Sequence, residues 1–189
     1  MGAIEVTRVF RAADRTGVGV LTALLFALIA LSVAGAPVRA ADDPAYLKLS
    51  AGYKGDIFAD RKSGGFFGFE YRAGPGLELW HIRPSFGIGA TTDASIYGWT
   101  ALNLDVYFGP RIVLTPSTGV GLYKTGSGQD LGGVLEFRNG ADLAWRFDDM
   151  ARVGIGLHYL SNYGIGDIDP GIGVVTLFYT HPLQAILPP

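Results

Sequence analysis

Few side chains in this sequence could carry out chemistry. Cysteine is absent, which excludes disulfides, thiolate zinc sites and cysteine nucleophiles. The three histidines, His81, His158 and His181, lie too far apart in the sequence to indicate a local metal site. Any reaction would therefore depend on hydroxyl groups, carboxylates or one of these imidazoles.

One of these imidazoles, that of His158, lies three residues before a serine, Ser161. A serine hydroxyl is a weak nucleophile until a base within hydrogen-bond reach takes its proton. On a regular strand, residues two apart point the same way, so Tyr159 rather than His158 would share the face of Ser161. A tyrosine hydroxyl, with an unperturbed pKa of about 10, is a poor base at neutral pH.

Two conformations of this segment remain open. A β-bulge at Tyr159–Leu160 would insert an extra residue and return His158 to the face of Ser161. Asp167 or Asp169, in the following loop, could then orient the imidazole ring.

Without a bulge, the uninterrupted alternation of residues 153–159 would continue into Ser161. His158 would then face the interior and form hydrogen bonds with its neighbours, and Ser161 and Asn162 would form the turn at the end of the strand.

The elements that must position these residues are strands. With 49% hydrophobic and 17% charged residues, the chain is too apolar to be intrinsically disordered. Apolar residues recur at every second position between segments rich in Gly, Pro, Asp and Ser. This pattern predicts eight strands, over residues 45–54, 65–72, 77–89, 95–108, 111–123, 135–147, 152–161 and 171–182.

Alternation alone does not say which face of a strand lies inside a barrel. A soluble, lipocalin-like barrel would turn its apolar face inward, whereas a membrane barrel turns it toward lipid. Strands of about ten residues, aromatic residues near strand ends, and a last strand without a polar face favour the membrane. We predict an all-β fold, an eight-stranded antiparallel outer-membrane β-barrel.

The polar faces of the strands carry charges of both signs. Eight strands leave room for side chains in the interior but not for a broad aqueous channel. We therefore expect a packed, charge-compensated interior rather than a pore or a catalytic pair of carboxylates. Its expected members are Glu70, Arg72, Arg83, Asp105, Glu136, Arg138, Asp142 and Arg146.

The first forty residues resemble a secretory leader. Arginines at positions 8, 11 and 15 precede an apolar run from Val18 to Ala34, and small or modest residues precede Ala41. We predict a signal peptide over residues 1–40 and a barrel domain over 41–189. A short membrane anchor is the alternative. The formal charge of −2, without a basic stripe, excludes nucleic acid as a partner.

Four segments of the sequence resemble the PagL-type lipid A 3-O-deacylases, also called acyloxyacyl hydrolases. They are Leu131–Arg138, Arg146–Phe147, His158–Asn162 and Asp169–Gly171. The family pattern is His, one residue, Ser, Asn, then a loop that ends near Asn-Pro-Gly, one residue, Glu. Ser161 and Asn162 match this pattern, whereas Tyr159 and Gly173 stand at the histidine and glutamate positions.

The resemblance implies an eight-stranded barrel in the outer membrane of a Gram-negative bacterium, reached after signal-peptide cleavage. It implies hydrolysis of an ester-linked acyl chain of lipid A within lipopolysaccharide, by a site on the lipid-facing outside of the barrel. In this chain Ser161 would be the nucleophile, His158 the base, and Asn162 would help to order the oxyanion site. The resemblance implies no metal or organic cofactor and leaves a homodimer open. The alternative is a catalytically inactive barrel with a structural or lipid-binding role.

Overall fold

The computed structural model describes residues 43–55, 63–75 and 82–183. Strands make up nearly all of this part of the chain, and no helix within it is long and apolar enough to cross a membrane. The strands are β1 (Tyr46–Gly55), β2 (Gly64–Arg72), β3 (Ile82–Thr91), β4 (Ile96–Leu104), β5 (Val106–Phe108), β6 (Ile112–Lys124), β7 (Leu135–Arg146), β8 (Arg152–Ser161) and β9 (Ile172–Pro182).

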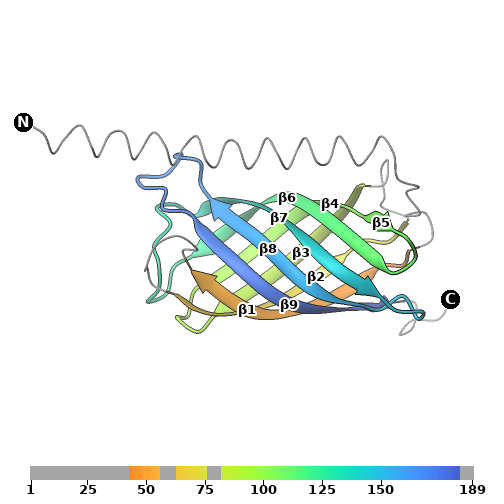
Figure 1. The fold of residues 1–189 in the computed structure, drawn as a ribbon. Coiled ribbons are helices and arrows are strands. Elements are labelled where there is room, and N and C mark those ends of the chain that lie inside the picture. The colour runs from red at the N-terminus through yellow and green to blue at the C-terminus, as the bar shows by residue number, and fades with distance from the viewer. Residues whose placement is uncertain (1–42, 56–62, 76–81, 184–189) are drawn as a thin grey trace, which may run out of the picture. The chain divides into compact units, whose positions relative to one another are not determined.

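These strands form a closed antiparallel barrel (Figure 1). Each strand pairs with the next along the chain except that β4 pairs with β6 rather than with β5, and β1 pairs with β9 to close the barrel. The short strand β5 continues β4 in the same register, with Asn103 opposite Ser117 and Val106 opposite Leu114. Because β4 and β5 together act as one strand of the barrel, the predicted eight-stranded antiparallel β-barrel is confirmed.

The observed strand ends coincide with the predicted ones or differ by at most two residues where both can be compared. The predicted strand over 95–108 is interrupted at Asp105, whose carboxylate accepts hydrogen bonds from Thr115 at 2.6 Å and Arg152 at 2.9 Å. The predicted signal peptide over 1–40 and the start of the strand predicted from residue 77 lie outside the described residues.

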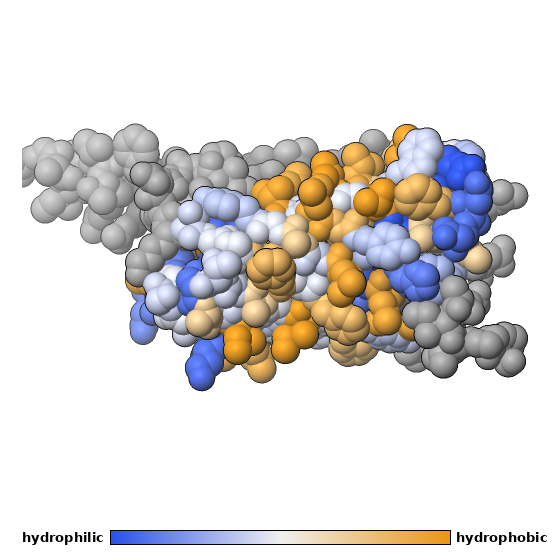
Figure 2. Space-filling model, turned by 90° about the horizontal axis from the view of Figure 1, so that it is seen from below, coloured by the Kyte–Doolittle hydropathy of each residue, from blue (hydrophilic) through white to orange (hydrophobic). Residues whose placement is uncertain are grey.

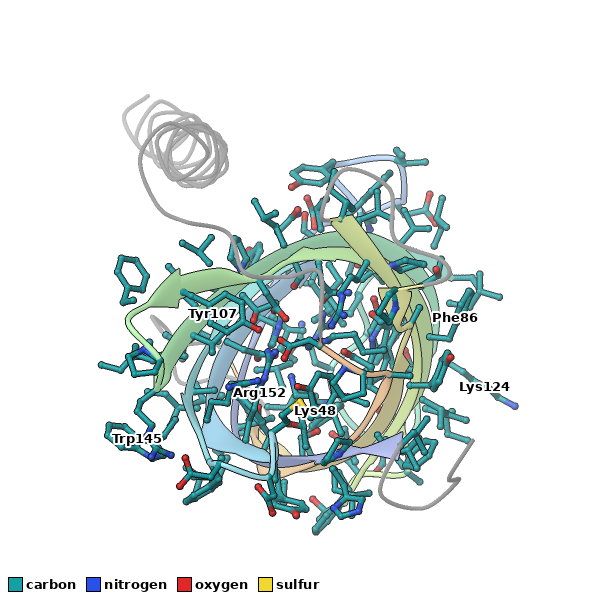
Figure 3. All side chains as sticks on the ribbon, turned by 90° about the vertical axis from the view of Figure 1, so that its right-hand side faces the viewer. Lys48, Phe86, Tyr107, Lys124, Trp145 and Arg152 are labelled. Carbon is teal, nitrogen blue, oxygen red and sulfur yellow. The ribbon has the colours of Figure 1, made fainter. Side chains whose placement is uncertain are left out.

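The outside of the barrel is apolar. Most of the exposed side chains along the strands are apolar and stand at alternating positions, and Leu177 in the middle of β9 is 69% exposed. Figure 2 shows these side chains gathered over one face of the barrel, with hydrophilic residues toward its ends. Phe86 and Trp145 point away from the barrel, whereas Lys48 and Arg152 point into it (Figure 3). This polarity is that of a membrane barrel rather than a lipocalin-like soluble one.

The interior of the barrel holds compensated charges in two groups. The first group surrounds Arg152, which donates hydrogen bonds to Asp43, to Asp105 at 2.9 Å and to the Tyr107 hydroxyl at 2.8 Å. Arg146 also donates to Asp43, at 3.2 Å. Each buried cation of this group therefore faces a carboxylate, which offsets the cost of removing both from water.

The second group surrounds Asp142. Its carboxylate pairs with Lys48 and accepts a hydrogen bond from Arg72 at 3.1 Å. Arg72 also donates to Glu70 at 3.0 Å, and the indole of Trp99 donates to the same carboxylate at 3.1 Å.

These two groups contain five of the predicted interior side chains, Glu70, Arg72, Asp105, Asp142 and Arg146, and Arg83 lies 3.9 Å from Asp105. Among the described residues, Glu136 is buried without a hydrogen-bond partner, and Arg138 contacts the Trp99 ring instead of a carboxylate.

The two ends of the barrel differ. We call the end where β1 begins and β9 finishes the terminal end; the turns there, 109–111 and 147–151, are short. The opposite end, here called the loop end, carries the longer segments 125–134 and 162–171. Outer-membrane barrels have short periplasmic turns and longer extracellular loops, and the fully described segments named here differ in length in the same way.

A charge placed on the outer face should destabilise the barrel according to its depth. Leu177→Arg, in mid-strand, is expected to cost about 2–4 kcal/mol, because the guanidinium would face hydrocarbon. The matched variant Ile112→Arg, at the first residue of β6, should cost only about 0–1 kcal/mol. Denaturant unfolding in lipid vesicles measures both values, and equal costs would contradict a lipid-facing exterior.

Candidate functional site

The site forms where β8 meets the loop end of the barrel. Along β8, Val153, Ile155 and Leu157 are exposed, whereas Gly156 and His158 are buried in the interior. The same alternation places Tyr159 and Ser161 on the outer face. Ser161 is nevertheless only 4% exposed, because the loop 162–171 covers it.

His158 lies in the interior, on the opposite face of β8 from Ser161. Its Nε2 atom is 3.6 Å from Asp142 Oδ1, within the second ionic group. The register across β8 advances one residue at a time, with His158 opposite Gly140, Tyr159 opposite Asn139 and Leu160 opposite Arg138. No residue is inserted at Tyr159–Leu160, so the bulge considered above is not formed, and the structure does not bring His158 to Ser161.

The group that contacts the Ser161 hydroxyl is the carboxylate of Asp169. Ser161 Oγ lies 3.0 Å from Oδ1 and 2.9 Å from Oδ2 of Asp169, and donates its proton to this carboxylate. The same oxygen accepts a hydrogen bond from the Tyr163 backbone N–H at 3.1 Å. A hydroxyl group and a carboxylate that can accept its proton are therefore in direct contact on the outer face of the barrel.

Asn162 connects the two loops that flank the serine. Its side-chain nitrogen donates to the backbone carbonyls of Leu131 and Ile168, both at 2.7 Å, and its side-chain oxygen accepts from the Gly164 N–H at 2.8 Å. Its backbone N–H lies 3.3 Å from Asp169 Oδ1. Because its side-chain amide and its backbone N–H both make contacts with the loops, Asn162 is suited to holding the loops in place around Ser161.

Tyr159 and Gly173, which stand at the histidine and glutamate positions of the resemblance, face each other directly. They are a cross-strand pair between β8 and β9. The Tyr159 hydroxyl extends beneath the loop to Gly171, where an added Cβ atom would lie 1.7 Å from it. Gly171 also has a φ of +61°, so both space and backbone conformation require glycine there.

The loop around Ser161 presents apolar side chains to the surroundings. Tyr163, Ile165 and Ile168 are all exposed, and Ile165 is 70% exposed. The Tyr163 ring packs against Phe137, with ring centroids 5.2 Å apart, and Phe137 is the cross-strand partner of Ser161. The serine is thus surrounded by surface suited to contact with acyl chains.

The residues predicted from the sequence were Ser161, His158 and Asn162, with Asp167 or Asp169 to orient the imidazole. The structure brings Ser161, Asn162 and Asp169 together and places His158 apart from them. Sequence reasoning considered Asp169 only as a group that would orient His158, and so missed its contact with the serine itself. The available signal was the position of Asp169 directly before Pro170–Gly171, where the family pattern has an amide. Among the described residues, no three histidine, aspartate or glutamate side chains cluster closely enough to hold a metal ion.

Comparisons with known proteins show the family and the fold of the chain. The profile of the family described as lipid A 3-O-deacylase (PagL) matches residues 64–182. The crystal structure of the outer membrane enzyme PagL is similar, with a TM-score of 0.58 and 19% identity over 72% of this chain and 99% of that chain. No curated protein matches the sequence.

Two further barrels show weaker similarity. The Yersinia pestis outer membrane protein Ail has a TM-score of 0.45 and 12% identity, over 74% of this chain and 100% of that chain. A de novo designed transmembrane β-barrel has a TM-score of 0.44 and 13% identity, over 73% of this chain and 93% of that chain.

Proposed function

Because the chain belongs to the lipid A 3-O-deacylase (PagL) family, we propose that it hydrolyses an ester-linked acyl chain of lipid A, with Ser161 as the nucleophile. The observation behind this assignment is the environment of Ser161. Its hydroxyl lies on the outer face of the barrel, at the loop end, in contact with a carboxylate. A membrane lipid that approaches this face of the barrel from the side would reach the hydroxyl next to the loop 162–171 that covers it.

The placement of the site supports lipid A as the substrate. Lipid A presents its sugar at the membrane surface and its acyl chains in the hydrocarbon. The loop end corresponds to the extracellular side, and the exposed Tyr163, Ile165 and Ile168 would contact acyl chains beside Ser161. In this proposal the barrel lies in the outer membrane of a Gram-negative bacterium, after cleavage of residues 1–40, and its partner is lipopolysaccharide.

The proposed reaction has two steps. Ser161 Oγ attacks the ester carbonyl and displaces the sugar hydroxyl, which leaves the acyl chain on the serine. Water then hydrolyses this acyl-enzyme and releases a free fatty acid. Asn162 holds the loops on either side of the serine and so orders the site around the reacting carbonyl.

A second candidate is a catalytically silent barrel with a structural or lipid-binding role. One observation favours it: Tyr159 occupies the position of the family's histidine, while His158 lies in the interior against Asp142. A serine hydrolase that loses its imidazole loses most of its turnover. The two candidates differ in whether lipid A is altered.

Mass spectrometry of lipid A distinguishes the two candidates. Lipid A should be isolated from Gram-negative cells that express the full chain and from matched cells that do not. Hydrolysis predicts a new species that is lighter by one ester-linked hydroxyacyl chain. An unchanged acyl pattern, with the chain folded in the outer membrane fraction, would support the silent barrel.

A further inference from the structure

The contact between Ser161 and Asp169 assigns a role to the carboxylate. We infer that Asp169 is the general base that activates Ser161, so that the site is a serine–aspartate pair rather than a serine–histidine–glutamate triad. This inference rests on the proposed hydrolysis of lipid A. Both carboxylate oxygens lie within 3.0 Å of the serine oxygen, which is within the range required for proton transfer.

Neither of the two histidines within the described residues provides an alternative base at this position. His158 is in the interior, and His181 lies near the terminal end, where its ring contacts Tyr179. His81 lies outside the described residues. Among the described side chains, Asp169 is the titratable group that contacts the hydroxyl of Ser161.

The local structure holds the carboxylate in position. The Asn162 backbone N–H lies 3.3 Å from Oδ1, and the Asn162 side chain anchors the loop through the carbonyl of Ile168, next to Asp169. On the other side of Asp169, Pro170 and Gly171 lead directly into β9. Asp169 is therefore held between Asn162, which directly follows β8, and the start of β9.

The sequence departs from the family pattern in a compensating way. The pattern has histidine and glutamate where this chain has Tyr159 and Gly173, and both departures remove a proton-transfer group. It has an asparagine amide, which cannot take up a proton, where this chain has Asp169. The one position that gains a titratable group is therefore the position that contacts the nucleophile.

The proton can be followed through both steps. Asp169 takes the proton of Ser161 as Oγ bonds to the ester carbonyl carbon, and passes it to the sugar oxygen as the carbon–oxygen ester bond breaks. In the second step Asp169 takes a proton from the attacking water and returns it to Oγ as the acyl–serine bond breaks. The products are a free fatty acid and a lipid A hydroxyl. Asp169 is exposed, so water can reach it.

The test uses purified full chain, folded in detergent micelles with lipid A, and measures released fatty acid. Asp169→Asn keeps the shape and the hydrogen-bond acceptor but cannot accept the proton; it should lower the rate by about 10²–10⁴-fold. Asp169→Glu should retain part of the activity. The control Asp149→Asn, which alters a carboxylate that accepts a hydrogen bond from Ala151 N–H at the terminal end, should leave the rate unchanged.

A chemical rescue separates catalysis from a structural role. Formate added to Asp169→Ala should restore part of the rate, because a small carboxylate can take the place of the missing base, whereas a merely structural aspartate would not be replaced in this way. Heat-modifiable mobility in mild detergent confirms that each variant is folded.

The outcomes distinguish the inference from the proposed function. Hydrolysis that depends on Ser161, persists in Asp169→Asn and is lost in His158→Gln would overturn the role of Asp169 and leave the function intact. An unmodified chain that is folded but releases no fatty acid would overturn the proposed function and the inference together.

Discussion

Ser161→Ala is expected to reduce lipid A deacylation to the level of cells that lack the chain. The substitution removes the oxygen that attacks the ester, and loss of the nucleophile typically costs serine hydrolases about 10⁶-fold in turnover. Lipid A mass spectrometry measures the effect in cells, and fatty acid release measures it with purified protein. The barrel should remain folded, because Ser161 lies at the end of β8 and outside both ionic groups.

A matched substitution controls for the change of serine to alanine. Ser117 is also a buried serine in a strand, but it lies in β6, where it is the cross-strand partner of Asn103, away from the loop 162–171. Ser117→Ala should leave deacylation unchanged. If Ser161→Ala deacylates as fast as the unmodified chain, another group is the nucleophile and the assignment of Ser161 fails.

Restoring the family's groups at positions 159 and 173 is expected to accelerate hydrolysis by about 10²–10⁴-fold. In Tyr159→His/Gly173→Glu the imidazole would lie two residues before Ser161, on the same outer face. The carboxylate would lie directly across the strand pair, where it could orient the imidazole. Imidazole is the stronger base near neutral pH, so the serine would be deprotonated more readily.

The structure shows space for the histidine of this double variant. The Tyr159 hydroxyl reaches beneath Gly171, and a histidine ring is shorter than a tyrosine, so the loop need not move. The single variant Tyr159→His should give part of the gain, and Tyr53→His, at an exposed tyrosine of β1 on the outer face, should give none.

The double variant also tests the role of Asp169. With an imidazole as base, the further substitution Asp169→Asn should become well tolerated. A double variant that is folded and no faster than the unmodified chain would contradict the placement of Tyr159 and Gly173 beside the serine.

The fold could be predicted from the sequence because a barrel strand has a period of two. The alternation in segments such as 152–161 fixes both the extent of a strand and which side chains share a face. It did not fix which face meets lipid, since a soluble barrel has the same pattern with the opposite polarity. Strand length and the apolar last strand favoured an apolar face that points outward. The burial of Glu70, Arg72 and Asp142 inside the barrel establishes this polarity.

The site was harder to predict because it depends on a loop. Alternation alone placed His158 and Ser161 on opposite faces, as the structure shows, and only an inserted residue could have joined them. The contact between Ser161 and Asp169 spans eight residues of chain and is set by the path of the loop 162–171. No periodic pattern encodes that path, which depends on Asn162 and on the left-handed conformation of Gly171.

The central claim is that Ser161, on the outer face of the barrel, forms the covalent acyl intermediate. The most direct measurement is peptide mapping by mass spectrometry, after the full chain in micelles has been treated with a long-chain alkyl phosphonate that reacts with activated serines. We expect one phosphonate adduct, on the peptide that contains Ser161, and we expect excess lipid A to suppress the formation of this adduct. A folded chain that deacylates lipid A but carries no adduct at Ser161 would contradict this claim.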